Sequence, residues 1–193
     1  LKSYRLTIFD NLPRTGLPAE FQSYAEYQRH IQILINAGVM EDSTKIWWDL
    51  RPSARYPTLE TRIMDVCTRM DDAISLAALL VSTIRMLYRL RIKNQRWREY
   101  NPMLIRENRW RAMRYSFDEG LIDFGIGSIV PFEQLLDEFI ELTFEDAKSL
   151  GCESEVAATK DILSRGTSAH RQLKTYQLSI AAGKNKEDAL KDV

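Results

Sequence analysis

The amino-acid sequence predicts an α+β fold, with a few antiparallel strands in its first part and mostly helix after them. Residues 45–65 hold two short aromatic or β-branched stretches around a proline-containing turn, which is typical of a hairpin. From about residue 70 onward, apolar residues recur instead at helical spacing between glycine and proline breaks. Apolar residues make up 45% of the chain and charged residues 28%, so the composition suits a globular protein with a core.

Charge and composition narrow the function classes that the sequence allows. Lys plus Arg and Asp plus Glu are equal, at 27 each, so the chain lacks the basic excess typical of a nucleic-acid or membrane-surface protein. The longest apolar run, Ala73–Val81, is far shorter than the ~20 residues of a membrane span, which predicts no membrane partner. Two cysteines without metal spacing, and no signal peptide, favour a reduced, cytoplasmic protein.

The length and the two ends bear on domain organisation. At 193 residues, a single domain is the default expectation. The chain starts at Leu1, and a strand-like stretch, Tyr4–Phe9, follows without a polar lead-in, while residues 186–193 have the pattern of an unfinished helix. We therefore expect a chain truncated at both ends, and we expect an exposed sheet edge to make it a homo-oligomer.

The segment before the hairpin predicts one helix. Ser23 and Glu26 have the S-x-x-E spacing of a capping box, which marks a helix start. Apolar residues follow at helical spacing from Tyr27 to Ile35, and Gly38 supplies a stop.

Residues 45–65 predict an antiparallel hairpin. Lys45–Arg51 is aromatic and short enough for one strand, and Pro52–Pro57 reads as a turn. Thr58–Asp65 alternates and is rich in β-branched residues, which favours a second strand.

The remaining residues predict helices around one small hairpin. Asp71 or Asp72 should cap a helix that runs to about Lys93 and buries a leucine-rich side. That side consists of Leu76, Leu80, Thr83, Leu87 and Leu90. The elements expected after it are a helix from Asn101–Pro102 to about Tyr115, a hairpin over Leu121–Val130, a helix from Pro131 to about Gly151, and two or three helices over 153–193.

Charged residues alternate along both strands of the first hairpin. Because side chains alternate between the two faces of a strand, Glu60 and Arg62 share one face, as do Trp47, Asp49 and Arg51 on the preceding strand. The hairpin would bring acids and arginines onto one surface. Carboxylates suit magnesium, and arginine suits phosphoryl oxygens, so this surface fits phosphoryl transfer. From the spacing alone, a solvated sheet face without function remains the alternative.

Several blocks, in order along the chain, closely resemble the signature of the type 2 glutamate–cysteine ligases. Several motifs in the same order indicate a family far more specifically than one motif does. The matching blocks cover nearly the whole chain. The blocks are Leu12–Pro18, Thr44–Ser53, Thr58–Arg62 with Asp65, Glu107–Ala112 with Arg114, and Arg165–Ser168 with Arg171 and Gln172.

The resemblance implies that residues 1–193 are the C-terminal portion of one carboxylate–amine ligase catalytic domain. The fold it implies is glutamine-synthetase-like, with an antiparallel sheet that carries the active site and is backed by helices. Members use ATP and Mg²⁺ to phosphorylate a carboxylate, typically the glutamate side chain. An amine, typically that of cysteine, then displaces phosphate to form an amide. Small-molecule amino-acid substrates, ATP and Mg²⁺ are therefore expected.

The resemblance also implies roles for individual residues. Glu60 matches the family's magnesium-binding glutamate, and Arg62 matches the arginine that contacts the transferring phosphate. Arg51 is expected to be catalytic beside Arg62. The residues expected to bind substrate or nucleotide are Trp48, Asp49, Asn108 and Arg114. For Asn108 and Arg114, which lie on the predicted helix after residue 101, a structural role is the alternative.

One departure from the family pattern affects the expected activity. The family's N-terminal half carries further acidic metal ligands and a His-x-His strand, which this chain lacks. We therefore expect the chain alone to be inactive, and a non-catalytic fragment or degenerate member that acts in assembly is the alternative. Binding of nucleic acid through the basic, aromatic segment Arg85–Arg114 is disfavoured because the acidic segment Glu133–Glu155 offers a complementary charge.

Overall fold

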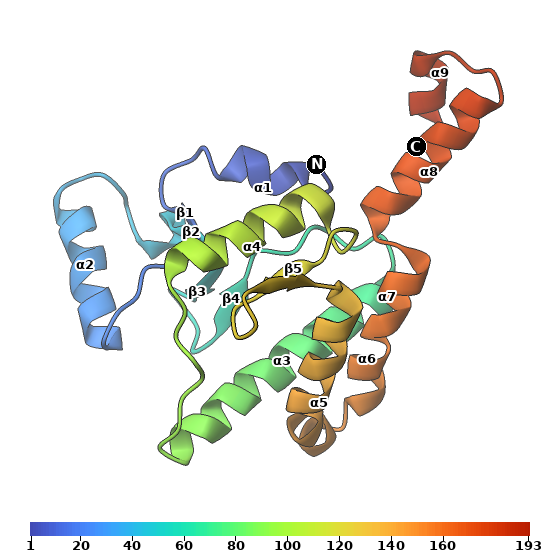
Figure 1. The fold of residues 1–193 in the computed structure, drawn as a ribbon. Helices are drawn as coiled ribbons and strands as arrows, with labels where there is room; N and C mark the ends of the chain where they lie inside the picture. Colours follow the sequence, from blue (N-terminus) through green and yellow to red (C-terminus); the bar gives the residue numbers. More distant parts are fainter. The chain divides into compact units, whose positions relative to one another are not determined.

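The computed structural model describes all 193 residues (Figure 1), and they form two compact units. The N-terminal unit is Ser3–Val66, and the C-terminal unit is Cys67–Val193 together with Leu1–Lys2. Lys2 joins the second unit because its amide donates to the carbonyl of Met113 at 2.9 Å. The expectation of one catalytic domain over the whole chain stays a prediction.

The N-terminal unit combines two helices with short strands. Its strands form two pairs, in which β1 and β2 run parallel, whereas β3 and β4 run antiparallel. The elements are α1 (Tyr4–Phe9), β1 (Thr15–Gly16), α2 (Tyr24–Asn36), the 3₁₀ turn η1 (Ser43–Lys45), β2 (Trp47–Trp48), β3 (Leu50–Pro52) and β4 (Leu59–Thr61).

Two sequence predictions in this unit need correction. Tyr4–Phe9 is a helix, not a strand, because apolar and β-branched residues follow their tertiary surroundings more than their own propensity. Lys45–Arg51 is not one strand. It starts as η1 and is interrupted at Asp49, whose amide donates to Gly16 at 2.7 Å and whose carbonyl accepts from Arg62 at 2.8 Å.

The predicted helix of this unit is confirmed, and the predicted hairpin forms with shorter strands, Leu50–Pro52 and Leu59–Thr61. Ser23 caps α2 by accepting the Glu26 amide at 3.1 Å, and Gly38 follows the helix with φ +70°, where a side chain would be strained. The core beneath α2 contains Tyr27, Ile31, Met40 and Ile46, with Phe21, Leu34, Ile35 and Trp48 packed against it.

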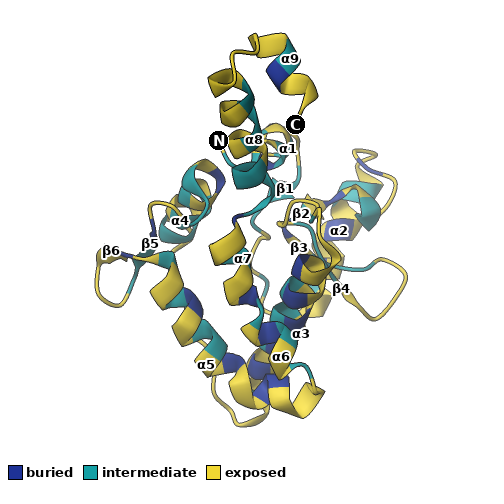
Figure 2. Cartoon of the chain, turned by 90° about the vertical axis from the view of Figure 1, so that its right-hand side faces the viewer, coloured by how far each residue is buried: buried dark blue, intermediate teal, exposed yellow.

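The C-terminal unit is mostly helical, with one small hairpin as the sequence predicts. Figure 2 shows buried positions gathered where α3, α5 and α6 meet, and the core there includes Ala78, Ala147 and Val156. The elements are α3 (Met70–Ile92), α4 (Pro102–Tyr115), β5 (Leu121–Asp123), β6 (Ser128–Val130), α5 (Phe132–Leu150), α6 (Glu153–Ala157), α7 (Thr159–Arg165), α8 (Ser168–Ala181) and α9 (Lys186–Lys191).

The prediction that α3 buries its leucine-rich side is wrong. Four of the five buried positions are instead small or polar, the fifth being Met86, and Leu87 is 43% exposed. Small residues let two helices approach closely. A search for hydrophobic periodicity does not find a helix side made of small residues, because large apolar side chains dominate the pattern. The predicted cap is also displaced, since Arg69 precedes the first helical residue. The buried positions of α3 are Asp72, Ser75, Ala78, Ser82 and Met86.

Ion pairs join the basic end of α3 to α5. Arg89 donates to Asp146, which is 1% exposed, at 2.8 to 3.2 Å, and Arg85 lies 3.7 Å from the same carboxylate. Glu145 lies 3.5 Å from Arg89. The predicted charge complementarity between these two regions is therefore confirmed, and arginines of the basic segment are used inside the protein.

One helix, α3, is long and apolar enough by length and composition to cross a membrane. The longest apolar run in the sequence, Ala73–Val81, is broken by Ser75 and is shorter than this helix. A core helix of a soluble protein passes the same test, and α3 packs against α5 and α6. The absence of a membrane partner stays a prediction.

The α+β class is confirmed by this mixture of helices and small sheets. The expected single antiparallel sheet is replaced by three two-stranded sheets, one of them parallel. The glutamine-synthetase-like fold stays a prediction.

Candidate active site

The hairpin of β3 and β4 brings Arg51 and Glu60 together, and Arg62 follows directly after β4, whereas Asp49 precedes β3. Arg51 lies directly opposite Glu60 in the antiparallel register. The turn is closed by Ser53, whose amide donates to Thr58 at 2.9 Å and whose hydroxyl accepts the amides of Arg55 and Tyr56. A turn fixed by its own hydrogen bonds holds the register, and the register decides which side chains face one another.

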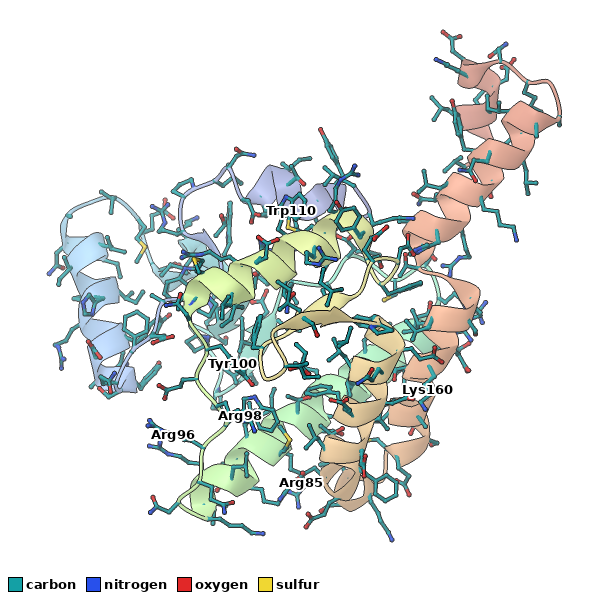
Figure 3. All side chains as sticks on the ribbon, in the orientation of Figure 1. Arg85, Arg96, Arg98, Tyr100, Trp110 and Lys160 are labelled. Atoms are coloured by element: carbon teal, nitrogen blue, oxygen red, sulfur yellow. The ribbon has the colours of Figure 1, made fainter.

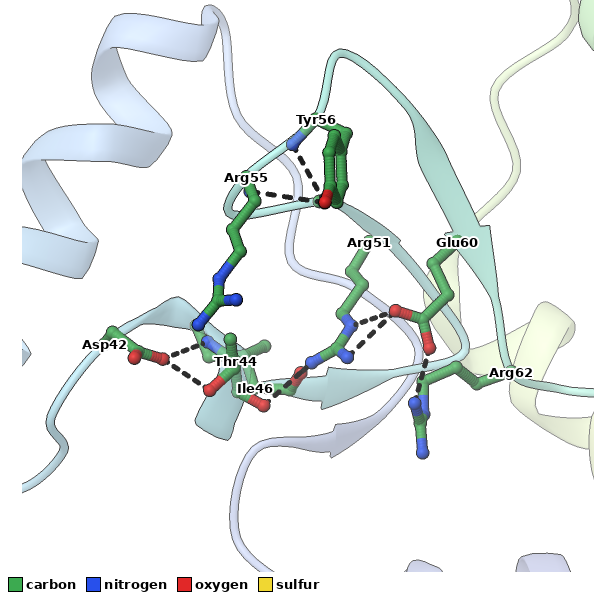
Figure 4. A network of polar contacts seen from close by, with 9 residues as sticks. Asp42, Thr44, Ile46, Arg51, Arg55, Tyr56, Glu60 and Arg62 are labelled. Carbon is green, nitrogen blue, oxygen red and sulfur yellow. Dashed lines mark hydrogen bonds and ion pairs between the residues drawn. The ribbon is translucent and has the colours of Figure 1, made fainter.

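Arg51 is fixed on both sides of its guanidinium (Figure 4). Nε and Nη2 donate to one carboxylate oxygen of Glu60 at 3.1 and 2.9 Å, and Nη1 donates to the carbonyl oxygens of Thr44, at 2.9 Å, and Ile46. Four of the five N–H groups of an arginine are therefore used within the protein. The side chain is only 12% exposed, so Arg51 has little left to offer a ligand.

Glu60 joins Arg51 to Arg62. Its second oxygen accepts from Nη1 of Arg62 at 2.5 Å. Burial raises the pKa of Glu60, but the hydrogen bonds and charges of Arg51 and Arg62 outweigh it and hold the pKa below its ordinary value. Glu60 is therefore an ionised carboxylate with an arginine on each oxygen.

Arg62 is the more available of the two arginines. Only its Nη1 is engaged with Glu60, and its side chain is 28% exposed. Nε and Nη2 make no hydrogen bond to the protein, which leaves one edge of the guanidinium for an anion. The structure thus separates two arginines that the sequence could not distinguish: Arg51 is committed to the protein, and Arg62 keeps a free edge.

Trp48 and Asp49 lie beside this pair but are mostly buried. Trp48 packs into the core of the N-terminal unit, with its ring 6.0 Å from that of Phe21 and 6.3 Å from that of Tyr27. Asp49 is 7% exposed, and its main chain links β1 to Arg62. Their roles in binding substrate or nucleotide stay predictions.

Asn108 and Arg114 belong to the C-terminal unit, on α4. The Asn108 amide group donates to the Ile122 carbonyl and accepts the Ile122 amide, both at 2.8 Å, so it holds β5 against α4. Arg114 is exposed and lies over the Tyr115 ring at 5.4 Å. These contacts favour the structural alternative for Asn108, and the binding roles of both residues stay predictions.

The residues of this chain offer only part of a magnesium site. A carboxylate such as Glu60 is the right kind of ligand, because magnesium usually takes one or two carboxylates together with phosphate oxygens. No group of three or more His, Cys, Asp and Glu residues gathers anywhere in residues 1–193. Both Glu60 oxygens already accept from arginine, so a metal ion would have to compete for them.

Sequence reasoning missed the anchors of Arg51. Its partners Thr44 and Ile46 act through main-chain carbonyls, which every residue has, so no residue type marks them. They are brought close by η1, and the sequence predicted an extended strand there. The one sequence signal for the turn η1 is Asp42, a residue type that often caps helical turns. Its side chain accepts the Thr44 amide at 2.7 Å and caps η1.

Comparison with known proteins decides the family. The profile described as "Glutamate-cysteine ligase family 2 (GCS2)" matches residues 1–193, the whole chain. The chain belongs to glutamate–cysteine ligase family 2.

Curated relatives of this family carry the same name. A protein of Rhodospirillum rubrum is 58% identical over 190 residues, which is 98% of this chain and 49% of the relative. A protein of Jannaschia sp. is 56% identical over 193 residues, 100% of this chain and 51% of the relative. One of Chloroflexus aggregans is 42% identical over 175 residues, 91% of this chain and 45% of the relative. All three are named as candidate glutamate–cysteine ligases of type 2.

The chain spans about half the length of these family members. A ligase activity is what the family and relatives' names indicate.

Proposed function

We propose that this chain serves an ATP- and magnesium-dependent ligase that forms an amide through an acyl phosphate. A carboxylate oxygen, most simply of the glutamate side chain, attacks the terminal phosphorus of ATP, and ADP leaves. The nitrogen of an amine, cysteine or another amino acid, then attacks the acyl carbon. Phosphate leaves with the electrons of the carbon–oxygen bond, and the nitrogen loses a proton.

The observation that carries this proposal is the oriented, half-free guanidinium of Arg62. Transfer of a phosphoryl group needs positioning and neutralisation of charge more than covalent help from the protein. Arg62 keeps two unbonded nitrogens, Nε and Nη2, that can donate to phosphoryl oxygens, and its other edge is held by Glu60. Arg51 contributes by fixing Glu60.

Magnesium would supply further neutralisation of phosphate charge when bound. We propose Glu60 as one ligand from this chain. The shortage of further acidic ligands here supports the proposal that this chain alone is inactive and that other parts of a family polypeptide complete the site. The reducing cytoplasm, where ATP is available, is the compartment that we propose for this activity.

An ADP-release screen of the protein at its natural length, against pairs of amino acids, tests the proposal. We expect ADP release only when both a carboxylate and an amine are present, with glutamate as the preferred carboxylate. Glu60→Gln should abolish turnover. Release of ADP at the same rate without an amine, or normal turnover by Glu60→Gln, would contradict the proposal.

A further inference from the structure

A small pocket lies within the N-terminal unit, beside β2. The loops that follow α1 and α2 both reach this side of the strand (Figures 1 and 3). The pocket has a volume of about 560 Å³, within the range of roughly 300–1,000 Å³ usual for small-molecule sites. Its lining does not include Arg51, Glu60 or Arg62, so it is a different site from the charged hairpin.

Part of the pocket lining is apolar. Trp47 is 36% exposed, and the ring of Phe9 packs against it edge to face, with 6.2 Å between the ring centroids. Val39 is 54% exposed, whereas Met40 is buried in the core of this unit. A flat ring beside aliphatic side chains suits the apolar body of a small ligand.

Arg14 is held in the lining by both its main chain and its side chain. Its φ is +61°, which is uncommon for a residue other than glycine, and its carbonyl accepts the Trp47 amide at 2.8 Å. Its Nε donates to the carbonyl of Lys45 at 3.3 Å. Nη1 and Nη2 make no hydrogen bond to the protein, so both can donate to an anion.

The segment that carries Lys45 and Trp47 is fixed from a second direction. The carbonyls of Thr44 and Ile46, on either side of Lys45, both accept from Nη1 of Arg51. The pocket lining is therefore formed before a ligand arrives. A preformed site lowers the entropy lost on binding.

The charges of the lining favour a ligand with one negative charge. Arg14 and Lys45 are positive and Glu41 is negative, which leaves one positive charge in balance. Lys45 pairs with Glu41 at 3.2 Å, so Arg14 is the lining cation without an ion pair. One carboxylate matches one free guanidinium edge, whereas a phosphate dianion would carry more charge than the lining balances.

We propose that this pocket binds a small carboxylate with an aromatic or branched apolar body. The two carboxylate oxygens accept from Nη1 and Nη2 of Arg14, and the apolar body lies against Trp47 and Val39. An apolar amino acid and a simple organic acid share this chemistry. The site is additional to the phosphoryl site that we propose at Arg62.

Titration calorimetry of the protein at its natural length tests the proposal with three probes. We expect 3-phenylpropionate to bind at one site, and 3-phenylpropionamide, which lacks the charge, to bind at least about tenfold more weakly. Phenylalanine separates the two sources of the carboxylate. Binding tighter than that of 3-phenylpropionate would indicate an amino acid, and weaker binding would indicate a simple organic acid. Failure of both acids to bind would overturn the proposal.

Variants place the ligand in this pocket. Arg14→Gln should weaken binding of 3-phenylpropionate by about tenfold or more, whereas Arg62→Gln should not change it. Equal binding by these two variants, or a loss with Arg62→Gln alone, would overturn the proposal. The second result would assign the ligand to the charged hairpin instead. Because calorimetry needs no turnover, a failed ligase assay would leave this result standing.

A second pair of variants keeps the arginine and fills the space instead. Val39→Trp should also weaken binding by about tenfold or more, because the added ring occupies the pocket. Ile33→Trp is the matched control, since Ile33 is also exposed and β-branched, at 62%, and does not line the pocket. Equal affinities of the Val39 and Ile33 variants would contradict the assignment.

Discussion

Arg51 and Arg62 contact the same carboxylate, but their surroundings give them different capacities. Arg51 is tied to two carbonyl oxygens as well as to Glu60, whereas Arg62 has only Glu60. A guanidinium whose N–H groups are already hydrogen-bonded gains little binding energy from a new anion. A guanidinium with free N–H groups on one edge gains more. We therefore regard Arg51 as a positioning residue and Arg62 as the residue that meets the ligand.

Replacing Arg51 with Lys should destabilise the N-terminal unit by about 1–3 kcal/mol. Lysine keeps the charge but cannot bind Glu60 through two nitrogens while also reaching the carbonyls of Thr44 and Ile46. The free energy of unfolding in urea measures the effect. Arg55→Lys, at an exposed position, is the control and should change little. Equal stability of the two variants would show that the contacts of Arg51 contribute nothing.

The pKa of Glu60 gives a prediction for pH. Its pKa is lower in the folded protein than its ordinary value of 4.5, so ionised Glu60 favours folding above that value. This contribution is lost as the pH falls through the folded-state pKa. The difference in unfolding free energy between the natural protein and Glu60→Gln should therefore be largest near neutral pH and shrink below about pH 4.5. A constant difference down to acid pH would contradict the ion-pair geometry.

At the scale of elements, α3 shows how packing can oppose a simple hydrophobic pattern. Ala78 is 7% exposed in the core with Ala147 and Val156, but its neighbour Ala77 is exposed. Ala78→Leu should cost about 1–3 kcal/mol by overpacking, while Ala77→Leu should stay within about 0.5 kcal/mol. Thermal unfolding of both variants checks this. A tolerated Ala78→Leu would mean that the leucine-rich side, rather than the small-residue side, is the packed one.

The hydrogen bonds of Asn108 make a second prediction at this scale. Removing both with Asn108→Ala leaves the main chain of Ile122 without partners at a partly buried position, which should cost about 1–3 kcal/mol. Hydrogen exchange of the Ile122 amide should become faster, while amides of α5 keep their protection. Unchanged exchange at Ile122 would remove the case for a structural role.

The comparison of elements shows what sequence could predict here and why. The Ser23 cap, the stop at Gly38 and the gathering of Arg51 and Glu60 on one hairpin surface follow from local rules, and the structure confirms them. The helix over Tyr4–Phe9 and the buried side of α3 depend on what packs around them, which no local pattern contains. At the site, the residue types predicted that charged side chains gather on the hairpin, but the main-chain carbonyls that fix Arg51 are brought there by the fold.

At the scale of the whole molecule, the division into units constrains how the site can be completed. The arginine pair and its carboxylate belong to Ser3–Val66, while Asn108 and Arg114 belong to the C-terminal unit. The chain matches about half of each relative, and its own residues gather no metal cluster. We propose that the family's other polypeptide segments supply the further groups that a complete catalyst needs.

The central claim is that the free edge of Arg62 meets the transferring phosphoryl group. Its most direct test is amino-acid-dependent ADP release by the protein at its natural length, with Arg62→Gln compared with Arg55→Gln, a control at an exposed arginine of the same hairpin. We expect Arg62→Gln to lower kcat by about 10²–10³, as the loss of a group that stabilises transition-state charge does, and Arg55→Gln to leave it unchanged. Full activity of Arg62→Gln, or equal losses in both variants, would contradict the claim.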